Sequence, residues 1–172
     1  MKSLVIYFSH TGENYMAHGI ENIEKGNTEI FAEYIKDITK ADLFKVDPKE
    51  KYPYNYYECC DVAKKEFNEN KRPVIKNTLE NINDYDVIYI GGPIWWGTYP
   101  MAIFTCIETL DFKGKIVMPF STHEGSGLGN VMSDLPKYCK DADIRKGLAI
   151  RGCKVKDNKK EIEGWCIKWK NK

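Results

Sequence analysis

The segment Leu4-Val5-Ile6-Tyr7-Phe8-Ser9-His10-Thr11-Gly12 joins a short apolar run to a hydroxyl-rich turn. Five consecutive apolar residues that end at turn-forming residues predict a buried β-strand, because a strand with one face in water would alternate polar and apolar side chains. The same arrangement, an apolar run followed by a polar or glycine-rich loop, recurs at residues 87–100 and 116–129. The three segments therefore predict central strands of a sheet that is covered on both faces.

The rest of the chain alternates between strand and helix patterns. Further strands are predicted at 43–46 and 144–150, and helices near residues 28, 56 and 100. Pro136 should end or kink a fourth helix that begins near Leu128. A last helix carries an apolar stripe at Ile162, Trp165, Cys166 and Trp169. Five βα units predict an α/β fold, a three-layer, doubly wound sheet of five parallel strands, in a single domain over residues 1–172.

The composition argues against several classes of partner. The 26 basic and 25 acidic residues give a net charge of +1, whereas a nucleic-acid-binding surface needs a clustered basic excess. The apolar run 4–8 is too short for a signal-peptide core or a membrane span, so we expect a cytoplasmic protein without membrane contact. The six cysteines include no C-x-x-C pair, and we expect reduced thiols. The histidines His10, His18 and His123 are scattered, so no metal site is predicted.

Two segments near the N-terminus are candidates for phosphate binding, because doubly wound sheets bind ligands beyond the carboxyl ends of their strands. The turn after the first strand can surround a phosphate with backbone N–H and hydroxyl groups, or it can be an ordinary polar turn. The second segment directly precedes the first helix, whose free N–H groups favour an anion. The residues concerned are Ser9, His10, Thr11, Gly12, Asn27 and Thr28.

The loop after the third strand contains two adjacent tryptophans, Trp95 and Trp96. Loops lie on the surface, and a flat heteroaromatic ring is the natural partner of an exposed indole. The alternative is that both rings pack on neighbouring helices. The candidate ligand-binding residues of this loop are Pro93, Ile94, Trp95, Trp96, Gly97 and Thr98.

The loop after the fourth strand is rich in glycine, which lets the backbone approach a ligand closely. The alternative is a simple turn into the next helix. His123 and Glu124 could form an acid–base pair, and it is equally possible that His123 donates a hydrogen bond to a ligand carbonyl. The candidate residues are Ser121, Thr122, His123, Gly125, Ser126 and Gly127.

Together the three loops resemble those of flavodoxins, which carry a Ser/Thr-x-Thr-Gly-Asn-Thr loop between the first strand and the first helix. Here that loop resembles one split by an insertion, Glu13 to Gly26. The resemblance covers nearly the whole chain and is closest to the branch with Pro-Ile-Trp-Trp-Gly-Thr and Thr-His-Glu-Gly-Ser-Gly loops. It implies the strand order 2-1-3-4-5 and FMN as the cofactor, with Trp95 stacked on the flavin and the candidate residues of all three loops around it.

The resemblance also implies a function in electron transfer. The leading interpretation is a carrier that passes electrons between redox partner proteins. The alternative is an FMN-dependent NAD(P)H oxidoreductase that acts on quinones or other small-molecule acceptors, and a non-catalytic flavin-binding protein is a third possibility. A carrier exposes only a flavin edge, whereas an oxidoreductase needs a pocket in which small reactants can stack. No catalytic residue is assigned, and the sequence leaves the oligomeric state open.

Overall fold

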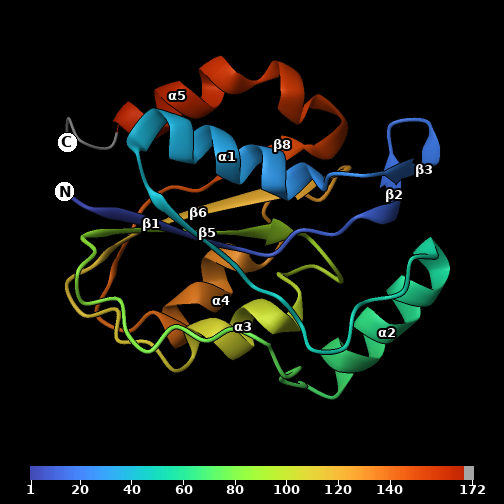
Figure 1. Cartoon of the computed structure of the whole chain (residues 1–172), viewed down its shortest axis with the longest axis horizontal. Helices are drawn as coiled ribbons and strands as arrows, with labels where there is room; N and C mark the ends of the chain where they lie inside the picture. The colour runs from blue at the N-terminus through green and yellow to red at the C-terminus, as the bar shows by residue number, and fades with distance from the viewer. Residues whose placement is uncertain (169–172) are drawn as a thin grey trace.

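A parallel β-sheet forms the middle layer of the computed structural model, which describes residues 1–168 (Figure 1). The strand order is β4-β1-β5-β6-β7, and β8 also pairs with β6. All of these pairs are parallel. The order confirms the predicted α/β class and the 2-1-3-4-5 topology. The strands are β1 (Ser3–Tyr7), β4 (Asp42–Lys45), β5 (Val87–Pro93), β6 (Ile116–His123), β7 (Asp143–Ile144) and β8 (Leu148–Arg151).

Helices cover both faces of this sheet. On one face lie α1 (Asn27–Thr39), α5 (Lys159–Lys168) and the 3-10 helix η1 (Gly152–Asp157); α3 (Met101–Ile107) and α4 (Val131–Tyr138) lie on the other (Figure 1). Successive side chains of a strand point to opposite faces. Leu4 and Ile6 accordingly pack in the core on the α3 and α4 side, while Val5 and Tyr7 pack on the α1 and α5 side. Two buried faces explain why the central strands are apolar throughout.

The predicted fifth strand is wrong as a single element, because β7 and β8 are separated by residues 145–147. Val117 pairs with Ile144 but Phe120 pairs with Leu148, so the fifth strand has one extra residue between these pairs. This bulge lies opposite Pro119, which has no N–H to donate to the ladder.

Two other boundaries differ from the prediction. The helix α4 continues through Pro136 to Tyr138, because the proline removes one hydrogen bond from a helix that ends two residues later. The spacing of Ile103, Phe104, Ile107 and Leu110 predicts a helix that reaches Leu110, but α3 ends at Ile107, and Leu110 lies beyond it, buried in the same core. Trp169 of the predicted apolar stripe lies outside the described residues, whereas Ile162 and Cys166 are buried as expected.

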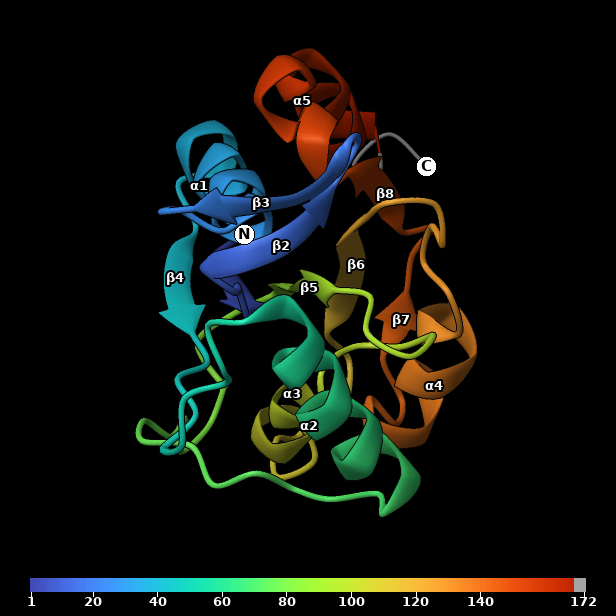
Figure 2. The same ribbon diagram turned by 90° about the vertical axis from the view of Figure 1, so that its right-hand side faces the viewer.

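The insertion that splits the first loop contains a β-hairpin. Its strands β2 (Gly12–Met16) and β3 (Gly19–Ile23) pair antiparallel at the carboxyl end of the main sheet, close to α2 (Tyr56–Asn68; Figure 2). Glu13 joins the hairpin to the start of α2, because its carboxylate accepts hydrogen bonds from the Tyr56 N–H at 2.8 Å and the Asn55 Nδ2 at 3.0 Å. None of the helices in residues 1–168 is long and apolar enough to cross a membrane.

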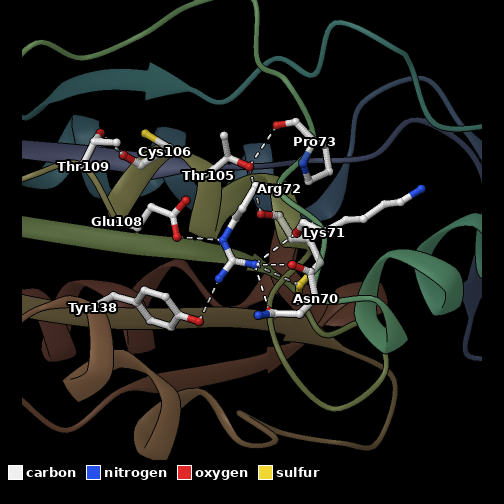
Figure 3. A network of polar contacts seen from close by, with 10 residues as sticks. Asn70, Lys71, Arg72, Pro73, Thr105, Cys106, Glu108, Thr109 and Tyr138 are labelled. Atoms are coloured by element: carbon white, nitrogen blue, oxygen red, sulfur yellow. Dashed lines mark hydrogen bonds and ion pairs between the residues drawn. The ribbon is translucent and has the colours of Figure 1, made fainter.

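Arg72 ties the irregular segment after α2 to the two helices beneath the sheet (Figure 3). Its Nε donates to the Glu108 carboxylate at 2.8 Å and its Nη2 donates to the Tyr138 hydroxyl at 3.1 Å. The guanidinium also lies over the rings of Phe104 and Tyr138, 5.8 and 5.7 Å from their centroids. A planar group with several donors can satisfy this geometry and a lysine ammonium cannot.

We therefore expect Arg72→Lys to lower the free energy of unfolding by about 1–3 kcal/mol, because charge-assisted hydrogen bonds and ring contacts are lost together. The neighbouring Lys71→Ala is the control, since the Lys71 ammonium is exposed in its ion pair with Glu69 and should contribute at most about 0.5 kcal/mol. Urea unfolding followed by circular dichroism measures both values. Equal stabilities for the two variants would contradict the assigned role of Arg72.

Candidate functional site

Residues from all three predicted loops meet at the carboxyl edge of the sheet, the side that faces the viewer in Figure 2. The hydroxyls of Thr28 and Thr122 are hydrogen bonded at 2.7 Å, and both side chains are buried. The rings of His10 and Trp95 are in edge contact, with centroids 5.6 Å apart. Thr28 and Thr122, which are 94 residues apart in sequence, are thus brought together, and all three predicted loops contribute residues to the candidate site.

The two halves of the split first loop lie against each other at Gly26. A β-carbon at this position would overlap the Ser9 hydroxyl and lie 2.8 Å from the His10 carbonyl oxygen. The Ser9 Oγ accepts a hydrogen bond from the Glu29 N–H at 3.0 Å, whereas the N-cap residue Gly26 provides no side-chain cap. Helix starts leave their first N–H groups without intrahelical acceptors. The start of α1 therefore presents backbone donors beside hydroxyl groups, an arrangement suited to an anion.

His10 is held as a neutral imidazole. Its Nε2 lies 3.2 Å from the Pro53 carbonyl oxygen, which requires a donor, and its Nδ1 lies 3.3 Å from the Asn14 amide nitrogen, which requires an acceptor. Burial lowers the pKa of His10 below its ordinary value, and these hydrogen bonds oppose that effect only in part. The ring thus connects the first loop to the segment before α2.

Trp95 and Trp96 have different environments. Trp95 is half-buried and makes edge contacts with Phe8, His10 and Tyr52. Trp96 is 44% exposed and donates from Nε1 to the Cys60 carbonyl oxygen at 3.0 Å, so it does contact a neighbouring helix. Residues 95–98 form a tight hairpin turn in which Trp96 has φ +53° and Gly97 has φ +85°. Positive φ at both central residues is the pattern of a type I′ turn.

The loop after β6 is organised by its own side chains. The Ser121 hydroxyl donates to the Gly127 carbonyl oxygen at 2.9 Å, and the Gly125 N–H donates to the His123 Nδ1 at 2.9 Å. Glu124 instead accepts from the Cys153 N–H at 2.8 Å. The Glu124 carboxylate is thus hydrogen bonded to the start of η1, whereas His123 accepts from the Gly125 N–H. The two side chains are therefore not arranged as an acid–base pair. Burial and the nearby Arg151 lower the pKa of His123.

Several predicted residues lie in strands or point elsewhere. Pro93 belongs to β5, and Ser121, Thr122 and His123 belong to β6. The hydroxyl of Thr98 donates to Asp134 of α4 at 2.8 Å, and its side chain is buried. Ile94 packs against the core, while Thr11, Gly125 and Ser126 are exposed. Gly12 opens β2 with φ +89°, a backbone conformation that favours glycine.

The structure also places residues here that the sequence prediction did not include. A cleft of about 520 Å³ lies between the hairpin, α2 and the tryptophan turn. The tyrosine-rich run at residues 52–57 could have indicated an aromatic wall here, but the apolar spacing of this region predicted only a polar helix that begins near residue 56. The added lining residues include Glu13, Asn14, Tyr56, Tyr57, Cys60 and Lys64. No group of three or more His, Cys, Asp or Glu side chains within residues 1–168 is arranged to hold a metal ion.

Comparison with known proteins gives consistent matches. A family model described as Flavodoxin matches residues 2–168. A protein described as a flavoprotein from Bacteroides uniformis is 29% identical, with a TM-score of 0.72, over 94% of this chain and 97% of that chain. One from Bacteroides eggerthii is 32% identical, with a TM-score of 0.68 and the same coverage.

A third solved structure is a flavoprotein from Lactobacillus acidophilus in complex with FMN. It is 23% identical to this chain, with a TM-score of 0.63, over 91% of this chain and 97% of that chain. At this identity the likeness concerns the fold. No match is found among the curated proteins.

The contact at Gly26 gives a stability prediction. We expect Gly26→Ala to lower the free energy of unfolding by about 1–3 kcal/mol, because the added methyl group must displace the Ser9 hydroxyl and the adjacent backbone. Gly164→Ala in α5 is the control, since a β-carbon there meets no atom within 4 Å and alanine favours a helix by about 1 kcal/mol. Chemical unfolding measures both. A Gly26→Ala protein as stable as the parent would show that the two halves are not in contact.

The neutral state of His10 predicts a pH dependence of stability. A histidine with a lowered folded pKa binds fewer protons than the unfolded chain, so the free energy of unfolding falls as the pH drops below about 6.5. His123 contributes in the same direction. We expect His10→Gln to reduce the loss of stability between pH 7.5 and pH 5.5, measured by urea unfolding at each pH. The exposed His18→Gln should leave that loss unchanged, and a similar effect of both variants would contradict the assignment.

Proposed function

Because the chain belongs to the flavodoxin family, we propose that it binds FMN and transfers electrons through it. The observation that carries this proposal is the start of α1 at the carboxyl edge of the sheet, where the N-cap residue Gly26 provides no side-chain cap and the hydroxyls of Ser9 and Thr28 lie in the first turn, that of Ser9 accepting from the Glu29 N–H. Such a helix start binds phosphate groups well. The complex of the related Lactobacillus acidophilus flavoprotein with FMN supports the same cofactor.

In this proposal each of the three loops binds a different part of FMN. Ser9, Thr11, Asn27 and Thr28 hold the phosphate together with the N–H groups of α1, while His10 positions the loop. Trp95 stacks on the flavin ring, and the loop at residues 123–127 approaches its polar edge with backbone groups. Bound FMN supplies electron transfer in one- or two-electron steps, and the chain binds it, orients it and excludes water from one face.

The leading role in this proposal is that of a carrier between redox partner proteins. Carriers expose a flavin edge to their partners, and the exposed loop residues Thr11, Gly125 and Ser126 leave this edge of the sheet open to solvent. The oxidoreductase alternative is favoured by a different observation, the cleft beside Trp95 and Trp96.

The phosphate site is tested by two substitutions. Ser9→Ala and Thr28→Ala should each weaken FMN binding by about 1–3 kcal/mol, because each removes a hydrogen bond to a charged group. Riboflavin, which has no phosphate, should lose much less affinity. Titration of the apoprotein, followed by flavin fluorescence, measures both ligands, and Ser133→Ala on the exposed part of α4 is the matched control.

The outcomes of this titration separate the phosphate site from a general loss of structure. If FMN and riboflavin lose affinity equally in the Ser9 and Thr28 variants, the hydroxyls do not bind the phosphate. If the apoprotein binds no FMN at all, the proposed cofactor is wrong.

A further inference from the structure

Glu66 is a half-buried carboxylate of α2 that lies outside the three loops of the candidate site. It accepts a hydrogen bond from the Tyr52 hydroxyl at 2.6 Å, and hydrogen bonds to an ionised acceptor are short and strong. Burial and the nearby Glu66 carboxylate raise the pKa of Tyr52, so the phenol remains the donor. Burial also raises the pKa of Glu66, and the hydrogen bond from Tyr52 opposes that effect. Each partner therefore stabilises the other in this position.

Tyr52 lies in a segment that has no regular structure to hold it. Residues 51–53 belong to neither a helix nor a strand, and they connect β4 to α2. No ladder of backbone hydrogen bonds fixes such a segment, so the position of the Tyr52 ring depends on side-chain contacts. The hydrogen bond to Glu66 fixes the hydroxyl end of the ring to a helix that has a defined place in the fold.

The other end of this connection is Trp95. The ring centroids of Tyr52 and Trp95 are 4.9 Å apart, with an angle of 84° between the ring planes. The corresponding distances from Trp95 to Phe8 and His10 are longer, at 5.3 and 5.6 Å. Edge contacts between aromatic rings are favourable and directional. The orientation of the indole therefore depends on where Tyr52 is held.

A small cavity beside Trp95 makes these ring contacts more important. The tight turn fixes the backbone, because the Trp95 N–H donates to the Thr98 carbonyl oxygen at 2.8 Å. A cavity of about 10 Å³ borders both Trp95 and Glu66, and a residue beside a void lacks part of its van der Waals contacts. Close packing alone thus does not place the indole. The residues around the cavity are Ala63, Glu66, Phe67, Trp95, Tyr99, Pro100 and Met101.

We propose that Glu66 is a positioning residue of the candidate flavin site, which acts through Tyr52 to hold the Trp95 indole in the orientation that stacks on the flavin. This inference rests on the proposed function, in which Trp95 is the stacking residue. It adds α2 to the elements that determine how tightly FMN is bound. A carboxylate that only stabilised α2 or the preceding segment would leave both Trp95 and flavin binding unchanged when it is replaced.

Titration of the apoprotein with FMN, followed by flavin fluorescence, tests the consequence for binding. Glu66→Ala should weaken FMN binding by about three- to tenfold, because Tyr52 loses its charged acceptor and the indole loses a fixed neighbour. Glu66→Gln keeps a neutral acceptor and should restore part of the lost affinity. Tyr52→Phe keeps the ring but not the hydroxyl, and it should match Glu66→Ala. The controls Glu58→Ala, on the exposed side of the same helix, and Tyr54→Phe, at a 60% exposed ring, should change affinity less than twofold.

A double variant decides whether Glu66 acts through Tyr52. If it does, Glu66→Ala combined with Tyr52→Phe should weaken FMN binding no more than the stronger of the two single substitutions. If the combined loss equals the product of the two single losses, the residues act independently and the inference is wrong.

The indole N–H resonance of Trp95 reports the position of the ring without any cofactor. Nuclear magnetic resonance of the apoprotein detects it, and its absence from a Trp95→Phe spectrum assigns it. We expect Glu66→Ala and Tyr52→Phe to shift this resonance. The resonance of Trp165, whose Nε1 donates to the Lys146 carbonyl oxygen at 2.9 Å, should stay in place. An unchanged Trp95 resonance in both variants would overturn the inference.

The two measurements separate this inference from the proposed function. If the parent protein binds no FMN, the proposed function is wrong, and the shifts of Trp95 still support its positioning by Glu66. If the parent binds FMN but Glu66→Ala leaves the affinity unchanged, the inference is wrong while FMN binding stands. Should Glu66→Ala unfold, Glu66→Gln replaces it in both measurements, with smaller effects expected in the same direction and no effect counting against the inference.

Discussion

Burial of a parallel sheet on both faces is the constraint from which the rest of this structure follows. Helices occupy the two faces of the sheet, so chemistry is confined to the edge where the strands end. At that edge the buried hydrogen bond between Thr28 and Thr122 joins the start of α1 to the end of β6. This hydrogen bond brings the second half of the split first loop close to the loop after β6. The contact of His10 with Trp95 places the tryptophan turn beside the first half of the same loop. A polar site is thus built on strand ends that are themselves rigid.

The insertion Glu13 to Gly26 changes this edge without disturbing the sheet. It leaves and returns at the same place, because the close approach of Gly26 to Ser9 and His10 restores the continuity of the loop. Glu13 then fixes the hairpin to the start of α2 through two hydrogen bonds. The result is a wall opposite the tryptophan turn. One insertion therefore adds a wall to this edge while the parallel sheet keeps its order.

The adjacent tryptophans show how neighbouring residues can acquire different roles. A type I′ turn directs Trp95 toward Phe8, His10 and Tyr52, while Trp96 reaches across to α2. Glycine at position 97 adopts the second positive φ without strain, whereas Trp96 adopts the first because its indole is hydrogen bonded to Cys60. We propose that Trp95, the ring nearest the core, stacks on the cofactor, and that Trp96 shapes the approach to it.

The sequence by itself determined the strands of the sheet and the edge at which the candidate site lies, because both depend on local pattern. The pattern consists of apolar runs such as 4–8 and 87–90, the helical stripe of α1, and the turn residues that follow each strand. The resemblance of the loops then supplied the strand order. The tertiary structure alone decided the division of the fifth strand opposite Pro119, the neutral hydrogen-bonded state of His10, the use of Thr98 by α4 and the cleft walled by Asn14, Tyr57 and Trp96. Each of these depends on contacts between residues far apart in the chain, and neither periodicity nor spacing along a sequence contains that information.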